Sequence, residues 1–199
     1  MLIGVKKRFL FVANSKTAST SIESVLINHA EIHRGGTPQR KHILMREALR
    51  EYDFLFSQPG YRPRAFFKFG VMRDPVDWIY SWFRYRKGNK VENALPADMS
   101  FEEFWKRDDW NKWRGPGKPR LQSDFFTFAR GGLIADYIIP YRALDNHFAQ
   151  ICTHLKIKAP LQKRNVSAIP GTPADLPPAM IEELRAFYAA DYALLERLG

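Results

Sequence analysis

The sequence lacks several features that would assign a chain to a familiar class. Among its 199 residues there is one cysteine, Cys152, so we expect no internal disulfide and no cysteine metal site. No apolar run approaches the length of a membrane span, and the first residues lack the order of a signal peptide. We therefore expect a cytoplasmic protein without a membrane span. No glycine lies between Arg8 and His33, so a Walker-type phosphate loop is absent there.

The composition is that of a globular protein with a basic surface. Hydrophobic residues make up 45% and charged residues 26% of the chain, which fits a single domain over residues 1–199. The formal net charge of +10 indicates an anionic partner, whether nucleic acid, acidic lipid or a polyanionic small molecule. The basic residues are spread along the chain and not gathered in one tail. This favours an anion-binding cleft, and we do not expect nucleic acid as a partner.

Short apolar runs alternate with stretches of helical periodicity. Buried strands are predicted within residues 8–14, 65–72 and 134–141. Helices are predicted from Ser19 or Thr20 onward and over residues 41–52, 75–86, 101–106, 144–155 and 178–198. The alternation predicts an α/β fold of three layers, with a central, mainly parallel β-sheet flanked by helices. Residues 88–121 interrupt the pattern, and we interpret them as an insertion or lid.

The segment from Ser15 to Ser21 joins the first predicted strand to the first predicted helix. Unpaired backbone N–H groups and the helix dipole at such a junction favour a bound phosphate or sulfate. Lys16 adds a full positive charge, and Ser19, Thr20 and Ser21 add hydroxyl donors. The alternative interpretation is an ordinary capped helix with a surface lysine.

This segment, Ser-Lys-Thr-Ala-Ser-Thr-Ser, resembles the 5′-phosphosulfate-binding loop of the sulfotransferase family, usually Pro-Lys-Thr-Gly-(Ser/Thr)-Thr-Ser. The resemblance implies the P-loop NTPase-like sulfotransferase fold and the sulfuryl donor 3′-phosphoadenosine 5′-phosphosulfate. It also implies that the donor is bound by Ser15, Lys16, Thr17, Ala18, Ser19, Thr20 and Ser21. Serine replaces the usual proline at position 15, and alanine replaces the frequent glycine at position 18. We expect that alanine to be tolerated only if its φ is negative.

A second motif begins at Arg73, after the second predicted strand. Asp74 is a predicted N-cap, with proline at the first helical position. Ser81 is seven residues beyond Asp74, about two helical turns, and so faces the same side as the helix start. Arg-Asp-Pro with this serine resembles the family's 3′-phosphate-binding element, and the planar guanidinium of Arg73 suits phosphate. Alternatively, Arg73 pairs with Asp74 or Asp77, and Ser81 only packs.

Further segments, among them residues 122–125 and 136–144, resemble the Golgi-type and bacterial branch of the family. Lys163-Arg164-Asn165-Val166-Ser167 resembles a loop of that branch near the nucleotide, which implies cofactor-binding roles for Lys163, Arg164, Asn165 and Ser167. The alternative is that Asn165 and Ser167 stabilise a turn while the two cations are solvated.

Sulfuryl transfer requires alignment of the acceptor and neutralisation of developing charge. Lys16 is the candidate for stabilising the leaving 5′-phosphate oxygen, and this scheme requires no metal. A hydroxyl acceptor also needs a general base, for which histidine is suited. His42 resembles a histidine that opens the second helix in this branch and is catalytic in several relatives. His33 is the other candidate, and a surface role is the alternative for both.

The acceptor is predicted only by class: a hydroxyl of a carbohydrate, lipid or other small molecule. All five tryptophans lie between residues 78 and 113, where they would stack on an acceptor or seat the insertion on the core. The favoured function is a sulfotransferase that releases 3′,5′-adenosine bisphosphate. The alternatives are a nucleotide kinase-like phosphoryl transferase and a non-catalytic basic domain that binds nucleotide or nucleic acid.

Overall fold

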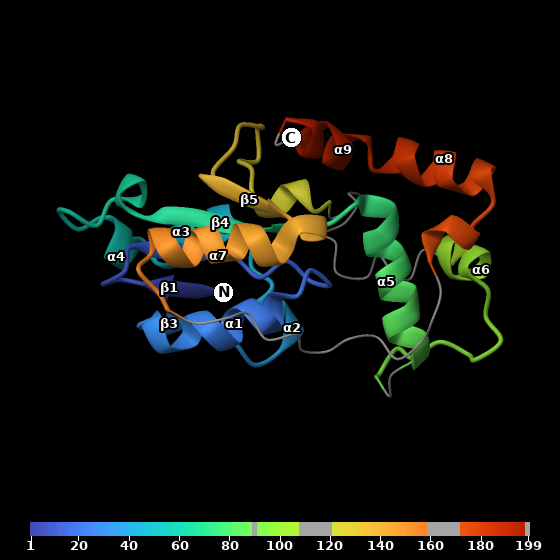
Figure 1. Ribbon diagram of the computed structural model, residues 1–199, viewed down its shortest axis with the longest axis horizontal. Helices are drawn as coiled ribbons and strands as arrows, with labels where there is room; N and C mark the ends of the chain where they lie inside the picture. Colours follow the sequence, from blue (N-terminus) through green and yellow to red (C-terminus); the bar gives the residue numbers. More distant parts are fainter. Residues whose placement is uncertain (89–90, 108–120, 159–171, 198–199) are drawn as a thin grey trace. The chain divides into compact units, whose positions relative to one another are not determined.

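The computed structural model describes residues 1–88, 91–107, 121–158 and 172–197 (Figure 1). The described residues form two compact units, each with its own apolar core. The first comprises those within Met1–Met72 and Gln122–Asn165, and the second those within Arg73–Leu121 and Val166–Arg197. A single domain with a lid at residues 88–121 stays a prediction.

Five strands build the sheet of the first unit, in the order β3-β1-β2-β4-β5. They are β1 (Leu2–Gly4), β2 (Phe9–Phe11), β3 (Ile32–His33), β4 (Phe67–Met72) and β5 (Tyr137–Pro140). β2, β4 and β5 come from the three predicted apolar runs and are parallel, whereas β1 pairs antiparallel with both β2 and β3. The sheet is therefore mixed, and the prediction of a mainly parallel sheet is wrong.

Helices α1 (Ser19–Leu26) and α7 (Leu144–His154) pack together with one face of this sheet (Figure 1). Alternate strand residues share a face, and Phe9, Phe11 and Phe69 contribute fully buried rings to this layer. Burial of such a ring stabilises a fold by about 1.5–3 kcal/mol. The helical layer thus fixes both the end of β2 and the start of α1, where the first candidate motif lies.

The other face of the sheet is approached closely by an aromatic ring. A Cβ added to Gly70 of β4 would lie 2.4 Å from the ring of Phe126, so only glycine fits there. Arg46, from α3 (Met45–Glu51), donates to the carbonyl oxygens of Asp124 and Thr127, each at 3.0 Å. These bonds tie α3 to the segment that carries Phe126.

Several short helical segments connect these elements. The predicted helix over residues 41–52 is shorter than expected, because His42 separates α3 from α2 (Pro38–Lys41). The remaining short segments of the first unit are α4 (Asp53–Phe56) and the 3-10 turns Ile27–His29, Pro63–Ala65, Ser123–Phe125 and Tyr141–Ala143. Cys152 of α7 is buried as predicted, and burial raises the pKa of its thiol.

The second unit is helical. Its helices are α5 (Pro75–Gly88), α6 (Phe101–Lys106), α8 (Pro178–Phe187) and α9 (Ala189–Glu196), with a 3-10 turn at Pro173–Asp175. The predicted helix over residues 178–198 is broken at Tyr188, whose φ of −95° and ψ of 22° end α8. Tyr188 is fully buried and packs its ring 6.1 Å from Trp78 and 6.2 Å from Trp105. Burial of this ring overrides local helix propensity.

Candidate functional site

The loop between β2 and α1 has a backbone that turns sharply. Thr17 is buried, and its hydroxyl donates to the carbonyl oxygen of Asn14 at 2.9 Å. Lys16 and Ala18 have φ of 59° and 57°, in the left-handed region, whereas φ of Thr17 between them is not positive. Left-handed residues in such a turn direct neighbouring N–H groups into a concavity, and such concavities bind anions.

Ala18 contradicts one expectation from the sequence. An alanine in place of the family's glycine was expected to be tolerated only with a negative φ, but φ is 57°. The left-handed conformation brings Cβ close to the following carbonyl oxygen and costs about 1–2 kcal/mol. Backbone strain of this size persists where the surrounding structure over-determines it, and it is concentrated at functional sites.

Helix α1 begins without a side-chain cap. Ala18 is its N-cap residue, and its carbonyl oxygen accepts the first helical bonds from Ser21 N at 3.0 Å and Ile22 N at 3.2 Å. The N–H groups of Ser19 and Thr20 precede these bonds, so they have no partner within the helix. Their donors and the helix dipole favour an anion at this end of α1.

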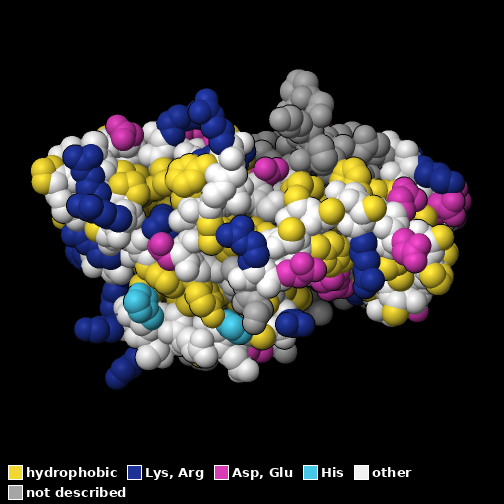
Figure 2. Space-filling model, turned by 90° about the horizontal axis from the view of Figure 1, so that it is seen from above, with side chains coloured by type: hydrophobic (Ala, Val, Ile, Leu, Met, Phe, Trp, Pro, Cys, Tyr) yellow, Lys and Arg dark blue, Asp and Glu magenta, His cyan; other side chains and the backbone are white. Residues whose placement is uncertain are grey.

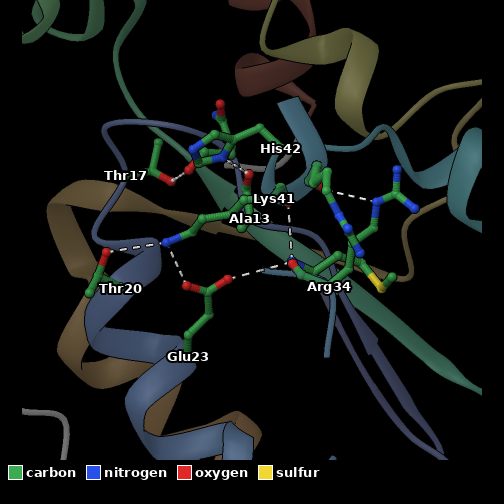
Figure 3. Close-up of polar contacts among 10 residues, drawn as sticks. Ala13, Thr17, Thr20, Glu23, Arg34, Lys41 and His42 are labelled. Carbon is green, nitrogen blue, oxygen red and sulfur yellow. Dashed lines mark hydrogen bonds and ion pairs between the residues drawn. The ribbon is translucent and has the colours of Figure 1, made fainter. Parts of the chain in front are cut away.

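A partly buried ion pair supports this helix start from the side (Figure 3). Nζ of Lys41 lies 2.6 Å from Oε2 of Glu23 and donates to the hydroxyl of Thr20 at 3.3 Å. Glu23 Oε1 also lies 3.5 Å from the amino group of Met1. Sequence reasoning missed Lys41 and Glu23, and the only signal was that Lys41 precedes His42. The pair orients the Thr20 hydroxyl within the predicted anion loop.

His42 lies against the same loop. Its Nδ1 is 2.6 Å from the carbonyl oxygen of Ala13, two residues before Ser15 (Figure 3). A carbonyl oxygen only accepts, so Nδ1 carries the proton and Nε2 is left as the acceptor atom. His42 does not open a helix, contrary to the prediction, since it follows α2 and precedes α3 by several residues.

Burial keeps the His42 ring neutral. Desolvation lowers its pKa from 6.5 to about 4, against an opposing contribution from the bond to Ala13. At neutral pH the ring is therefore an unprotonated base with a defined tautomer. The low pKa makes it a weak base whose accepting form is almost fully populated.

The other candidate base lies elsewhere on the sheet. His33 is an exposed residue of the edge strand β3, paired through its backbone with Leu2. The ring of His33 is approached by Gly35, where an added Cβ would lie 2.8 Å from it. His42 is the histidine that the structure places at the loop.

The second predicted motif lies in the second unit. Asp74 caps α5, because its Oδ1 accepts from the backbone N of Asp77 at 3.0 Å. Nε of Arg73 lies 2.6 Å from Oδ2 of Asp77, which is the ion pair considered as the alternative for this arginine. Ser81 is half-buried one turn beyond Asp77, so Arg73, Asp77 and Ser81 follow one side of the helix start.

Asp74 is held by one further contact. Tyr192 of α9 donates its hydroxyl to Oδ2 of Asp74 at 3.1 Å. Burial, with the carboxylate close by, raises the pKa of Tyr192 to about 12. The cap residue of α5 is thus fixed by both its helix and a tyrosine distant in sequence.

Some predicted residues lie outside the described part of the chain. Lys163, Arg164, Asn165 and Ser167 are among them, as are Trp110 and Trp113. Of the other tryptophans, Trp78 and Trp105 are buried in the core of the second unit, and Trp105 donates to Oε1 of Glu183 at 2.7 Å. These two rings are part of that core.

Comparison with known proteins gives no match to a family model, a curated protein or a solved structure. Within the described ranges, no group of three or more His, Cys, Asp or Glu side chains is arranged to hold a metal ion. A separate finding is that no helix formed by the described residues is long and apolar enough to cross a membrane.

Taken together, the first unit places a neutral histidine beside a loop whose backbone geometry suits an anion. Lys16, the Thr20 hydroxyl and the N–H groups at the start of α1 suit a phosphate or sulfate oxygen. Nε2 of His42 suits abstraction of a proton from a weakly acidic group. This combination is what transfer of an anionic group to a hydroxyl requires.

Proposed function

We propose that the chain is a sulfotransferase that moves a sulfuryl group from 3′-phosphoadenosine 5′-phosphosulfate to an acceptor hydroxyl. One observation carries the proposal: Lys16 and Ala18 are left-handed in the loop after β2, and the neutral ring of His42 binds the carbonyl oxygen of Ala13, two residues before that loop. The resemblance of Ser15–Ser21 to a phosphosulfate-binding loop supplies the identity of the anion. The proposed fold, in keeping with this resemblance, is the P-loop-like sulfotransferase fold.

In the proposed reaction, Nε2 of His42 removes the proton of the acceptor hydroxyl. The acceptor oxygen forms a bond to sulfur while the bond from sulfur to the 5′-phosphate oxygen breaks. The electron pair of that bond stays on the phosphate oxygen, which Lys16 and the N–H groups of Ser19 and Thr20 stabilise. The products are a sulfate ester, protonated His42 and 3′,5′-adenosine bisphosphate.

Arg73 and Ser81 have the proposed role of holding the 3′-phosphate. The ion pair with Asp77 orients the guanidinium at the start of α5, and arginine forms strong bonds to phosphate. Lys163, Arg164, Asn165 and Ser167 are proposed as further contacts to the donor, on the resemblance alone. The acceptor is proposed as a hydroxyl of a carbohydrate, lipid or other small molecule.

Calorimetric titration with 3′,5′-adenosine bisphosphate, ATP with magnesium, and duplex DNA tests the donor half of the proposal. We expect the bisphosphate to bind most tightly and Lys16→Ala to weaken it about tenfold to hundredfold, the effect of losing a charged hydrogen bond. Lys6→Ala is the matched control, because Lys6 is exposed in the β1–β2 turn. Preference for ATP would instead assign a kinase-like function, and preference for DNA a nucleic-acid-binding one.

The role of Arg73 is tested by comparing two nucleotides. Arg73→Ala should weaken the binding of 3′,5′-adenosine bisphosphate. The binding of 5′-AMP, which has no 3′-phosphate, should stay nearly unchanged. Equal losses for both nucleotides would show that Arg73 acts through Asp77 on the fold and does not hold the 3′-phosphate.

Transfer itself is tested with labelled donor and a panel of sugar, phenol and lipid alcohols. His42→Ala should abolish transfer and leave the affinity for the bisphosphate nearly unchanged. Turnover close to that of the wild type would remove His42 from the role of base. Tight binding of the bisphosphate without transfer to any acceptor would indicate that the protein binds the nucleotide but does not catalyse sulfuryl transfer.

A further inference from the structure

A second basic site lies at the opposite end of the parallel strands from the Lys16 loop. A cavity of about 340 Å³ is lined by side chains that include Lys7, Arg8, Arg64, Phe67 and His154. Arg8 and Phe67 stand at the amino ends of β2 and β4, whereas the Lys16 loop follows the carboxyl end of β2. Because these strands are parallel, the cavity and the loop are separate sites of the first unit.

The cations of this cavity are held in place by neutral groups. Nζ of Lys7 donates to the carbonyl oxygen of Lys156 at 2.9 Å, and Arg8 Nη1 donates to that of Gly60 at 3.0 Å. Carbonyl oxygens orient these side chains without cancelling their charge. In the part of the chain that the structure describes, no carboxylate pairs with Lys7, Arg8 or Arg64.

The negative charge of the one acidic side chain in the lining, Asp136, is already balanced by a lysine. Oδ2 of Asp136 lies 2.6 Å from Nζ of Lys68 and accepts from the backbone N of Lys68 at 2.8 Å. The charge of Asp136 is thus balanced within the protein. Three cations remain to act on whatever occupies the cavity, and a ligand of opposite charge would be attracted.

Arg8 occupies a strained backbone position. Its φ of 57° lies in the left-handed region, which glycine or asparagine adopts more easily in a turn. The guanidinium stacks 4.0 Å from the ring centre of Tyr61 and 5.4 Å from that of Phe66. A turn that only connected β1 to β2 would not need arginine here, so strain combined with a fixed cation points to a ligand contact.

Aromatic rings lie beside these cations. The ring of Phe67 lies 4.7 Å from that of His154 and 6.4 Å from that of Tyr137. The volume of the cavity falls within the usual range of small-molecule sites, roughly 300–1,000 Å³. Lys and Arg side chains gather at the left of the face shown in Figure 2.

We propose that this cavity binds a small ring-bearing phosphate or sulfate monoester. The ester group contacts Lys7, Arg8 and Arg64, and the ring lies against Phe67 and His154. Nucleic acid would need an extended row of phosphate contacts, which a cavity of about 340 Å³ does not provide. The site is independent of the proposed sulfuryl transfer, because it shares no residue with the Lys16 loop.

Calorimetric titration with phenyl phosphate, phenyl sulfate, inorganic phosphate and phenol tests the proposal on the full chain. We expect one or both esters to bind, and inorganic phosphate and phenol to bind more weakly, since each lacks one half of the recognised group. Comparison of the two esters decides between phosphate and sulfate. If phenol binds as tightly as both esters, or if no probe gives saturable binding, the proposal is wrong.

Two variants test whether the ester binds in this cavity. Arg64→Gln and Lys7→Gln should each lower the affinity for the favoured ester about fivefold to tenfold, which is the effect of losing one charged contact near solvent. The control Arg62→Gln removes the same charge from an exposed neighbour outside the lining, and it should change the affinity less than twofold. Arg64 is itself exposed, so its replacement should leave folding intact, which far-ultraviolet circular dichroism checks.

Lys16→Ala separates the two anion sites. Binding of the favoured ester should be unchanged in this variant, whatever its effect on 3′,5′-adenosine bisphosphate. The proposal fails if Lys16→Ala abolishes ester binding while Arg64→Gln does not, because the ester would then occupy the first loop. Equal losses in Arg62→Gln and Arg64→Gln would also overturn it, since they would reflect general attraction to a basic surface.

Discussion

Replacement of Ala18 by glycine tests the geometry of the anion loop without any ligand. Glycine adopts the φ of 57° found at this position without a steric clash, so Ala18→Gly should relieve about 1–2 kcal/mol of strain. The greater freedom of glycine in the unfolded chain offsets about 0.4–1 kcal/mol of this gain. The variant should therefore be more stable by about 1 kcal/mol, which corresponds to a rise in Tm of about 2–4 °C for a chain of this size.

The measurement is urea and thermal unfolding followed by circular dichroism, with Ala149→Gly as the control. Ala149 is exposed in the middle of α7 and its φ is not positive, so glycine there should destabilise the protein by about 0.5–1 kcal/mol. Opposite signs for the two variants are expected. If Ala18→Gly lowers stability as much as Ala149→Gly does, position 18 is not left-handed in solution and the proposed concavity is wrong.

Two further predictions concern the groups beside this loop. The pKa of His42 is about 4 in the fold against 6.5 ordinarily, so protonation favours the unfolded chain and stability is lost as pH falls from 6.5 to 4. As pH falls through this window, the unfolding free energy of the wild type should decrease relative to that of His42→Asn, by at most about 1.4 kcal/mol per pH unit. A difference between the two proteins that stays constant with pH would contradict the burial of His42. Glu23→Gln should destabilise the protein by about 1–3 kcal/mol, because Lys41 then loses its charged partner in a partly buried pair. Glu51→Gln removes the carboxylate of the more exposed pair with Arg34 and should lower the unfolding free energy by less than about 1 kcal/mol in the same denaturation experiment. Equal effects of the two variants would show that burial does not strengthen the Lys41 pair.

The sequence was most informative where an element is long or carries its own end signal. Helix α6 has the bounds predicted for it, and the Asp74 cap with its following proline marks the start of α5. β1 and β3 escaped prediction because strands of three and two residues are too short to show a period, whereas β2, equally short, lies within a longer apolar run. Nothing near Tyr188 signals the break between α8 and α9, since neither glycine nor proline is present and burial of the ring decides it.

The candidate site was predictable in its residue types but not in its contacts. Residue type at a strand–helix junction indicated Lys16, and the family resemblance indicated His42; the structure places both around one loop. The tautomer and the low pKa of His42 depend on the Ala13 carbonyl and on burial, which no local pattern encodes. The Lys41–Glu23 pair joins residues distant in sequence, and the strain at Ala18 depends on how β2 and α1 are fixed by packing.

The chain order of the sheet has a consequence for synthesis of the protein. β4 receives its partner β5 only after a long interval, since Tyr137 follows Met72 by 65 residues. At translation rates of about 5–20 residues per second, β5 emerges roughly 3–13 s later. During that time the outer edge of β4, an apolar strand that is buried in the finished protein, presents unpaired backbone groups to other chains. Yield of soluble protein should therefore depend on chaperones that bind nascent chains while residues 73–136 are being made.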